Sequence, residues 1–252
     1  MDEADKACGD PRWGQENRDR KAEAILTTLR LHCRRDLTQG TWLDIGCGSG
    51  GIASTLAGQV ARVVGVDPEP WDRWQEFERQ HPNIAFHVGT YAKLAELLGR
   101  DSCDVVICNQ VYEHVDDPVA LLSAIHTVLK PEGVCYFAGP NLLWPIEPHV
   151  FWPFVHWLPR NFAVRLMHVC GARRLAYFDA HSWSYWRLTK AFRHTGFDYA
   201  SAVRERIGAS ALRRGSFLAR AVLLIPRSVF TAFAFMSPGF VFVLRKRQQS
   251  SG

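Results

Sequence analysis

The sequence predicts an α/β fold built on a doubly wound sheet. Short apolar runs typical of buried parallel strands alternate with helical patterns between residues 41 and 138. A glycine-rich stretch at residues 41–51, TWLDIGCGSGG, links the first strand to the next helix. Glycines in such a turn permit positive φ and let backbone N–H groups approach a ligand at the helix N-terminus. The stretch therefore predicts a site for a nucleotide-like cofactor.

The elements follow one another in a regular order. A helical pattern at residues 17–35 either packs on the sheet or also closes the mouth of the cofactor site. A Pro-Glu-Gly sequence at residues 131–133 is expected to end the helix before the fifth strand. Further helices are predicted at 52–58, 71–81, 118–130 and 182–195, and strands at 42–45, 61–66, 84–88, 104–109, 134–138, 196–203 and 240–244.

Polar residues follow the carboxyl ends of the predicted strands. Asp67 ends the second strand, 21 residues after Gly46, and a carboxylate there can accept hydrogen bonds from two ribose hydroxyls. The later strands lead into Gly89-Thr90, Asn109-Gln110 and Pro140-Asn141. Ligands of doubly wound sheets bind beyond the carboxyl ends of the strands, so these loops are expected to share one site.

Two kinds of cofactor fit the glycines. The spacing Gly46-x-Gly48-x-x-Gly51 with Asp67 formally satisfies the dinucleotide pattern of dehydrogenases. Asp44 argues against a dinucleotide, because its carboxylate would repel a pyrophosphate. The same carboxylate would attract the ammonium group of a sulfonium cofactor with an amino-acid tail.

Four motifs in this order resemble those of the class I S-adenosylmethionine-dependent methyltransferases. They are LDIGCGSGG, VVGVDP, DVVICNQVYEHVDDP and LLSAIHTVLKPEGVCYFAGPN, all within residues 40–141. The resemblance implies a Rossmann-like, mostly parallel seven-stranded sheet whose last strand, at 240–244, runs antiparallel. Many relatives carry an aspartate for the adenine amine where this chain has Thr90. The expected cofactor is S-adenosyl-L-methionine, and its expected binding residues are Asp44, Gly46, Cys47, Gly48, Gly50, Asp67, Pro68, Thr90, Tyr91, Asn109 and Gln110.

Two histidines are candidate general bases for removing a proton from a hydroxyl acceptor. His114 follows the fourth strand, where the reacting methyl group should lie, although it could instead hold the loop in place. His149 lies in the segment after the fifth strand. The ubiquinone-pathway O-methyltransferases, which this region also resembles, associate two glutamates and a histidine here with a metal. Gln110 replaces one of those glutamates beside Glu113 and His114, so no metal is predicted.

The alternation of strands and helices stops after residue 141. An aromatic and proline-rich segment at residues 142–180 is typical of a cap over the open edge of the sheet. Residues 204–238 form a second, amphipathic insertion before the last strand. Its apolar run at 217–236 contains two arginines and a proline, which predicts two short helices rather than one spanning helix.

Charge is divided unevenly along the chain of 252 residues. Residues 1–141 hold 14 Lys/Arg and 21 Asp/Glu, a net charge of −7, whereas residues 142–252 hold 16 and 4, a net charge of +12. The second part is therefore expected either to face an anionic partner or to be a solvated basic surface. Peripheral membrane contact is predicted through residues 142–165 and 210–238, in the manner of the insertion that the ubiquinone-pathway enzymes carry after strand five.

The seven cysteines form no CxxC pair and favour a reducing compartment. The first ten residues are acidic and polar, unlike a signal peptide, so the expected location is cytoplasmic, peripheral on a membrane. We expect one methyltransferase domain over residues 1–252. Its segments are an N-terminal tail and helix (1–39), a cofactor-binding core (40–141), the cap (142–180) and a C-terminal part (181–252).

The resulting hypothesis is methyl transfer to a hydroxyl of a hydrophobic or lipid-linked small molecule. The alternatives are N- or C-methylation of a soluble metabolite, or a catalytically silent protein that binds the cofactor and a partner. Nucleic-acid methylation is not expected, because the fourth strand leads into NQVY rather than an NPPY-like tetrad. The sequence does not predict an oligomeric state.

Overall fold

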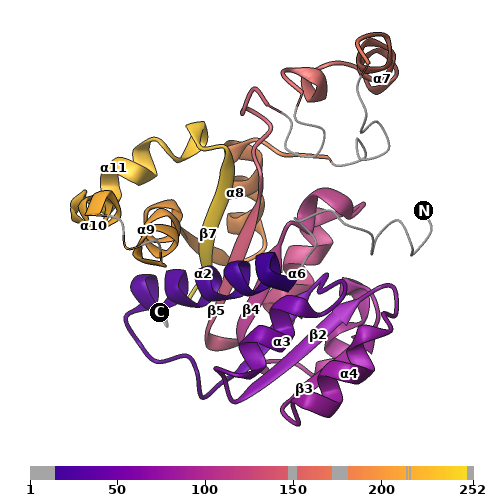
Figure 1. Cartoon of the computed structure of the whole chain (residues 1–252), viewed down its shortest axis with the longest axis vertical. Coiled ribbons are helices and arrows are strands. Elements are labelled where there is room, and N and C mark those ends of the chain that lie inside the picture. The colour runs from indigo at the N-terminus through magenta and orange to yellow at the C-terminus, as the bar shows by residue number, and fades with distance from the viewer. Residues whose placement is uncertain (1–14, 147–151, 172–180, 214, 216, 249–252) are drawn as a thin grey trace.

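A single seven-stranded sheet forms the centre of the molecule (Figure 1). The computed structural model describes residues 15–146, 152–171, 181–213, 215 and 217–248. The strand order is β3-β2-β1-β4-β5-β7-β6, and β7 is antiparallel to both of its neighbours. The expected topology is therefore confirmed. The strands are β1 (Thr41–Ile45), β2 (Arg62–Asp67), β3 (Ile84–Val88), β4 (Cys103–Asn109), β5 (Leu129–Pro140), β6 (Phe197–Ser201) and β7 (Gly239–Lys246).

The strand order reverses between β1 and β4, which are paired in the middle of the sheet. Ile45, near the end of β1, lies beside Val66 of β2 and Cys108 of β4. The three strands therefore deliver their following loops to the same edge. This is the switch point at which doubly wound sheets bind ligands.

Helices cover both faces of the sheet and divide the core into two layers. The helices α2 (Gln15–Cys33) and α3 (Gly51–Ala57) pack on one face with residues such as Trp42 and Val105. The helices α6 (Pro118–Val128) and α8 (Tyr185–His194) pack on the other face, over residues such as Leu43. Neighbouring residues of one strand thus serve opposite layers, because successive side chains of a strand point to opposite faces.

Several boundaries differ from those predicted. The helix α6 ends at Val128 and β5 begins at Leu129, so the sequence Pro131-Glu132-Gly133 lies inside the strand, next to a register shift. The strand β6 ends at Ser201 instead of continuing to residue 203. A short helix, α5 (Leu94–Leu98), occupies a segment for which no helix was predicted, whereas α9 (Val203–Arg213) opens the insertion at residues 204–238, for which helical structure was predicted. The sequence of α5 has a mixed polar and apolar pattern, so tertiary packing decides its structure.

The described part of the cap forms a lobe that projects from the body (Figure 1). Its helix α7 (Arg160–Val169) packs Ala163 and Met167 against Val155, a small cluster separate from the main core. The Trp157 indole N–H donates to the carbonyl of Leu142 where the lobe begins. This bond joins the described part of the lobe to the start of the cap.

The second insertion is tied to the sheet by one buried side chain. Asn141, directly after β5, donates through Nδ2 to the carbonyl oxygens of Phe235 and Ser237, each at 2.8 Å. Its Oδ1 accepts from the N–H of Leu143 at 3.0 Å. The start of the cap and the end of the second insertion are therefore held together at one residue.

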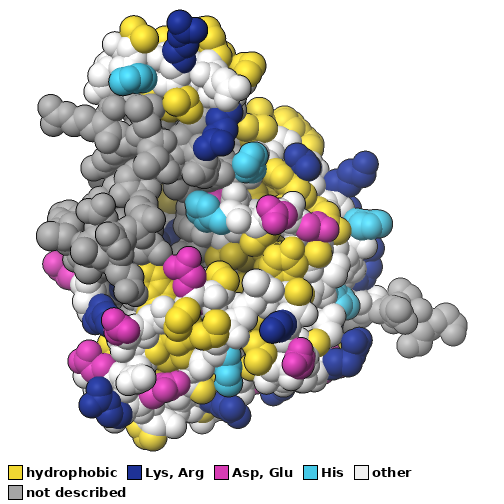
Figure 2. Space-filling model, turned by 90° about the vertical axis from the view of Figure 1, so that its right-hand side faces the viewer, with side chains coloured by type: hydrophobic (Ala, Val, Ile, Leu, Met, Phe, Trp, Pro, Cys, Tyr) yellow, Lys and Arg dark blue, Asp and Glu magenta, His cyan; other side chains and the backbone are white. Residues whose placement is uncertain are grey.

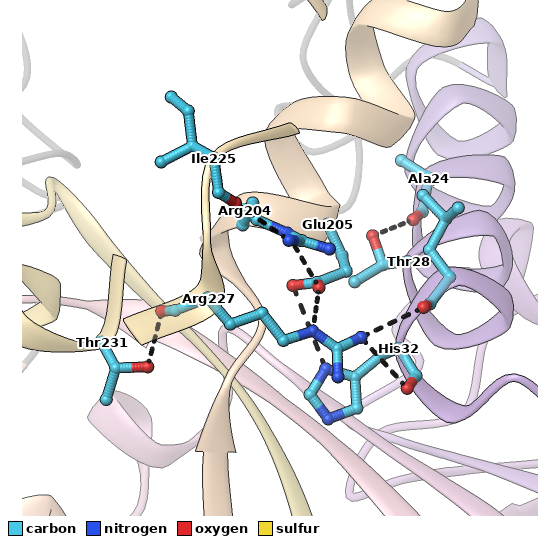
Figure 3. A network of polar contacts seen from close by, with 9 residues as sticks. Ala24, Thr28, His32, Arg204, Glu205, Ile225, Arg227 and Thr231 are labelled. Atoms are coloured by element: carbon cyan, nitrogen blue, oxygen red, sulfur yellow. Dashed lines mark hydrogen bonds and ion pairs between the residues drawn. The ribbon is translucent and has the colours of Figure 1, made fainter. Parts of the chain in front are cut away.

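A buried ionic cluster joins the second insertion to α2 (Figure 3). Glu205 of α9 is fully buried, and its Oε1 lies 2.7 Å from Nε of Arg227 and 3.2 Å from Nε of Arg204. Arg227 begins α11 (Arg227–Ala232) and also donates to the carbonyl oxygens of Leu31 and His32 at 3.2 and 3.3 Å. It therefore caps the last turn of α2, whose final carbonyls have no partner within the helix.

The cluster keeps Glu205 ionised. Burial raises the pKa of Glu205, but the contacts with His32, with its own backbone and with Arg227 outweigh burial and hold the pKa at about 2 instead of 4.5. A carboxyl pKa that is depressed in the folded state stabilises the protein above about pH 4.5. This stabilisation is lost as the pH falls from about 4.5 to about 2.

We expect Arg227→Met to reduce the free energy of unfolding at pH 7 by about 3–5 kcal/mol, because Glu205 would stay buried without its main counter-charge. Urea unfolding measures this. The matched control is Arg247→Met, which breaks an exposed pair with Asp198 at 3.2 Å and should cost less than about 1 kcal/mol. Equal losses in the two variants would contradict the role given to the buried cluster.

Candidate cofactor and acceptor site

The loop between β1 and α3 adopts a backbone that only glycine takes without strain. Gly46, Gly48 and Gly50 have φ values of +65°, +52° and +80°. A Cβ on Gly50 would also lie 2.6 Å from a ring carbon of Phe86. The N–H of Gly46 donates to the carbonyl of Val66 at 2.8 Å, which fixes the loop to the end of β2.

Asp67 lies at the end of β2 beside this loop. Its Oδ2 accepts from the N–H of Gly48 at 2.8 Å, and its Oδ1 accepts from the N–H of Glu69 at 3.2 Å. The carboxylate is therefore held in one orientation by two backbone groups. Each oxygen keeps a further lone pair for another donor, such as a ribose hydroxyl.

Asp44 lies deep in β1 with a carboxylate that is not fully paired. It is 3% exposed, and its Oδ2 has no hydrogen-bond partner among the described residues. Burial raises the pKa of Asp44 to about 7; the charge of Arg18 opposes this rise, and that of Asp67 adds to it. A buried carboxylate with an orphaned oxygen suits a cationic ligand group. It therefore fits the ammonium group of S-adenosylmethionine.

Arg18 is a site residue that the sequence interpretation missed. It belongs to the first turns of α2, and its side chain lies against Gly51, where an added Cβ would meet Arg18 Cγ at 2.9 Å. Its Nη2 reaches to 3.9 Å from the position that a Cβ of Gly48 would occupy. Burial lowers the pKa of Arg18, and the charge of Asp44 partly offsets this effect. Arg18 lies four, seven and eleven residues before the buried Ala22, Ile25 and Leu29, so a charge on the buried face of α2 was the signal that could have found it.

The first turns of α2 also bond to the loop and its helix. Gln15 Nε2 donates to the carbonyl of Gly51 at 3.3 Å, and Thr55 Oγ1 donates to Asp19 at 2.6 Å. Farther along, α2 packs on the sheet through residues such as Leu29. The helix therefore packs on the sheet and also covers the glycine loop.

The remaining expected cofactor residues lie on loops at the same edge. Gln110 follows β4 with φ of +61°, and its N–H donates to the carbonyl of Ala138 at 2.8 Å. Strained backbone of this kind is common at functional sites. Thr90 is exposed and precedes a 3₁₀ turn, Tyr91–Lys93, without capping it.

The other predicted residues differ in burial. The Cys47 side chain is buried, and burial raises the pKa of its thiol well above 9. Pro68 is exposed, and Asn109 is partly buried at the end of β4.

Of the two candidate bases, only His114 lies within the described residues. His114 is exposed and ends the 3₁₀ turn Tyr112–His114 that follows β4. The N–H of His181 donates to the carbonyl of Glu113 at 2.8 Å, so the chain returns to this turn after the cap. His149 lies outside the described residues. Among the residues that the structure describes, no group of three His, Cys, Asp or Glu side chains is arranged to hold a metal ion.

Comparison with known proteins identifies the family. The pattern of a family described as a methyltransferase domain matches residues 15–203. The chain belongs to the class I S-adenosylmethionine-dependent methyltransferases. It is therefore a methyltransferase, and S-adenosylmethionine is its cofactor.

Curated relatives of this methyltransferase match over part of the chain. The chain is 30% identical over 139 residues to a ubiquinone biosynthesis O-methyltransferase of Glaesserella parasuis. The match covers 51% of this chain and 59% of the relative. The chain is 35% identical over 104 residues to the enzyme of the same description from Acinetobacter baylyi, covering 39% and 43%. The chain thus spans less than two thirds of the length of these relatives.

Solved structures share the fold of this methyltransferase. The Burkholderia thailandensis 1,6-didemethyltoxoflavin-N1-methyltransferase, with S-adenosylhomocysteine bound, has a TM-score of 0.54 and 18% identity over 94% of this chain and 82% of that one. The plantazolicin methyltransferase BamL, also with S-adenosylhomocysteine, has a TM-score of 0.57 and 14% identity over 92% and 85%. At these identities the likeness shows the fold alone.

We expect Asp44→Asn to stabilise the free methyltransferase at pH 8 by about 1–3 kcal/mol, because the amide removes a buried, partly unpaired charge. The raised pKa of Asp44 means that the native free protein gains stability as the pH falls from about 7 to about 4. The advantage of the variant should therefore shrink by pH 5. At pH 8 the variant should bind S-adenosylhomocysteine at least about tenfold more weakly. Urea unfolding and isothermal titration calorimetry measure the two effects.

Asp104→Asn is the control for this prediction. Asp104 Oδ2 accepts from the N–H of Thr41 at 2.8 Å and from Lys130 Nζ at 2.7 Å, so this carboxylate has a counter-charge of its own. Its loss should destabilise the protein and leave cofactor binding unchanged. If Asp44→Asn destabilised the free protein at pH 8 in the same way, Asp44 would have a partner of its own.

Proposed function

We propose that this methyltransferase transfers a methyl group to a hydroxyl of a hydrophobic or lipid-linked small molecule. The observation that carries the proposal is the exposed apolar stripe of the cap. Phe162, Leu166 and Val169 are 57%, 38% and 79% exposed, four and three residues apart on α7. They share one side of the helix, away from Ala163 and Met167 in the small core of the lobe. A cap with apolar side chains on its surface suits an apolar acceptor or its lipid environment.

We assign three side chains to the methionine and ribose parts of the cofactor. Asp44 would bind the ammonium group and Arg18 the carboxylate of the methionine moiety, while Asp67 would accept hydrogen bonds from the ribose. Support comes from the burial of Asp44, the position of Arg18 beside Gly48 and the fixed orientation of Asp67. Bound S-adenosylmethionine supplies an electrophilic methyl group and leaves as S-adenosylhomocysteine.

The protein must then position the acceptor and remove one proton. His114 is our first candidate base: its imidazole would take the hydroxyl proton as the acceptor oxygen bonds to the methyl carbon. Its place in the 3₁₀ turn that follows β4, near Gln110 at the edge that also holds the glycine loop, supports this role. His149 remains a second candidate within the cap. The name of the curated relatives, ubiquinone biosynthesis O-methyltransferases, supports a hydroxyl acceptor.

Two apolar surfaces support contact of the enzyme with a membrane. Figure 2 shows hydrophobic, Lys/Arg and His side chains together on the projecting lobe, and residues 152–171 contain no Asp or Glu. In the second insertion, Leu224, Phe233 and Met236 are 85%, 61% and 59% exposed. Exposed apolar side chains beside basic ones are typical of surfaces that lie on anionic lipid. No helix among the described residues is long and apolar enough to cross a bilayer.

The acceptor is tested with S-adenosylmethionine labelled on its methyl group. We expect label to enter a lipid-soluble fraction of a cell extract, and His114→Gln to lower kcat by about 10²- to 10⁴-fold while binding of S-adenosylhomocysteine stays unchanged. The control is His194→Gln, an exposed histidine at the end of α8. Label found only in water-soluble products would favour a soluble metabolite, and binding without any transfer would favour a silent protein.

Liposome flotation tests membrane contact. We expect the native enzyme to float with vesicles of anionic lipid and Phe162→Ser/Leu166→Ser to float far less, because the variant removes half-exposed apolar area from the lobe. The control is Val88→Ser, which changes a side chain of 52% exposure on β3, outside both insertions. Equal flotation of both variants and the native chain would reject contact through the cap.

A further inference from the structure

An aromatic pair lies beneath the glycine loop, outside the residues assigned to the site so far. Trp74 belongs to α4 (Arg73–Gln80) and Phe86 to β3. Their rings stack with centroids 5.0 Å apart and planes 9° from parallel. Trp74 is buried, at 7% exposure. The pair fills the space that side chains at Gly50 and Gly65 would need, since a Cβ at either glycine would lie within 2.6 Å of Phe86 ring atoms.

The indole N–H of this pair makes a directed bond to the loop. Trp74 Nε1 donates to the carbonyl oxygen of Gly48 at 2.9 Å. The N–H of the same glycine donates to Asp67 Oδ2 at 2.8 Å. Both backbone polar groups of Gly48 are therefore held, one by the tryptophan and the other by the carboxylate beside the loop.

Gly48 needs such restraint because of its backbone conformation. Its φ of +52° lies in the left-handed region, and glycine is the residue with the most conformations to lose on folding. A Cβ at Gly48 would meet nothing closer than 3.9 Å, so packing around this residue is open. Hydrogen bonds therefore restrain this point of the loop where packing does not.

We propose that Trp74 is a positioning residue for the cofactor. By holding the carbonyl of Gly48, it keeps the N–H of Gly48 directed at Asp67, and so keeps the Asp67 carboxylate oriented toward the ribose hydroxyls. The stack with Phe86 holds the indole in place for this bond. The inference rests on the proposed role of Asp67 and adds a residue that contacts neither the reacting atoms nor the acceptor.

The test compares two tryptophans that make the same bond in different places. Trp74→Phe keeps the aromatic stack and removes the N–H donor. Trp42→Phe is the matched control, because Trp42 is fully buried in β1 and its Nε1 donates to the carbonyl of Leu37, also at 2.9 Å. We expect similar losses of thermal stability, but only Trp74→Phe should raise the Kd for S-adenosylhomocysteine, by about two- to tenfold, the range for loss of one hydrogen bond. In turnover, KM for S-adenosylmethionine should rise while kcat stays within about twofold.

A double-mutant cycle with Asp67→Asn tests the route through Gly48. If Trp74 acts by orienting Asp67, Trp74→Phe should change the Kd less in the Asp67→Asn background than in the native one. Phe86→Leu is the second variant if Trp74→Phe does not fold; it loosens the stack and should also raise the Kd. Equal Kd values for Trp74→Phe and Trp42→Phe, or fully additive effects in the cycle, would overturn the proposal. Native-like binding by Asp67→Asn alone would instead reject the role of Asp67.

Discussion

The cofactor edge of the structure depends on the hydrogen bonds that hold the loop after β1 in a left-handed backbone conformation. Gly46, Gly48 and Gly50 are all left-handed within five residues. The N–H groups of Gly46 and Cys47 both donate to the carbonyl of Val66, so the end of β2 anchors the start of the loop. Once this loop is in place, α3 can begin at Gly51 and the first turns of α2 can pack over it. Backbone hydrogen bonds thus shape the candidate site at this edge of the sheet, and the side chains of the site are placed on that frame.

Local patterns were enough to predict this edge, because the candidate cofactor residues lie at the ends of individual strands. Asp67 follows β2 and Gln110 follows β4, and parallel strands must bring such positions together. Arg18 and Trp74 were not predicted, since each reaches the loop from a helix and only packing brings it there. The burial of Glu205 in α9 was not predicted for the same reason: a carboxylate is a poor candidate for burial until Arg204 and Arg227 surround it.

The two insertions differ in how firmly the rest of the fold holds them. The second insertion is bound by Asn141 at one end and by the Glu205 cluster at α9 and α11. The described lobe of the cap has its own small core around Met167, and Trp157 bonds it to the carbonyl of Leu142. Aromatic and proline content indicated both the place and the apolar surface of the cap. The position of the cap relative to the sheet could not be predicted, because its small core is separate and sequence periodicity indicates only which residues are buried.

The contact between Arg227 and α2 also has a consequence for the order of folding. Arg227 donates to the carbonyls of Leu31 and His32, which precede it by 196 and 195 residues. A ribosome makes α2 long before it makes this arginine. The last turn of α2 is therefore capped, and the charge of Glu205 balanced, only after residue 227 has been made. Contacts this distant in sequence slow folding, so we expect the last turn of α2 to be secured later than its first turns, which bond to the glycine loop near them in sequence.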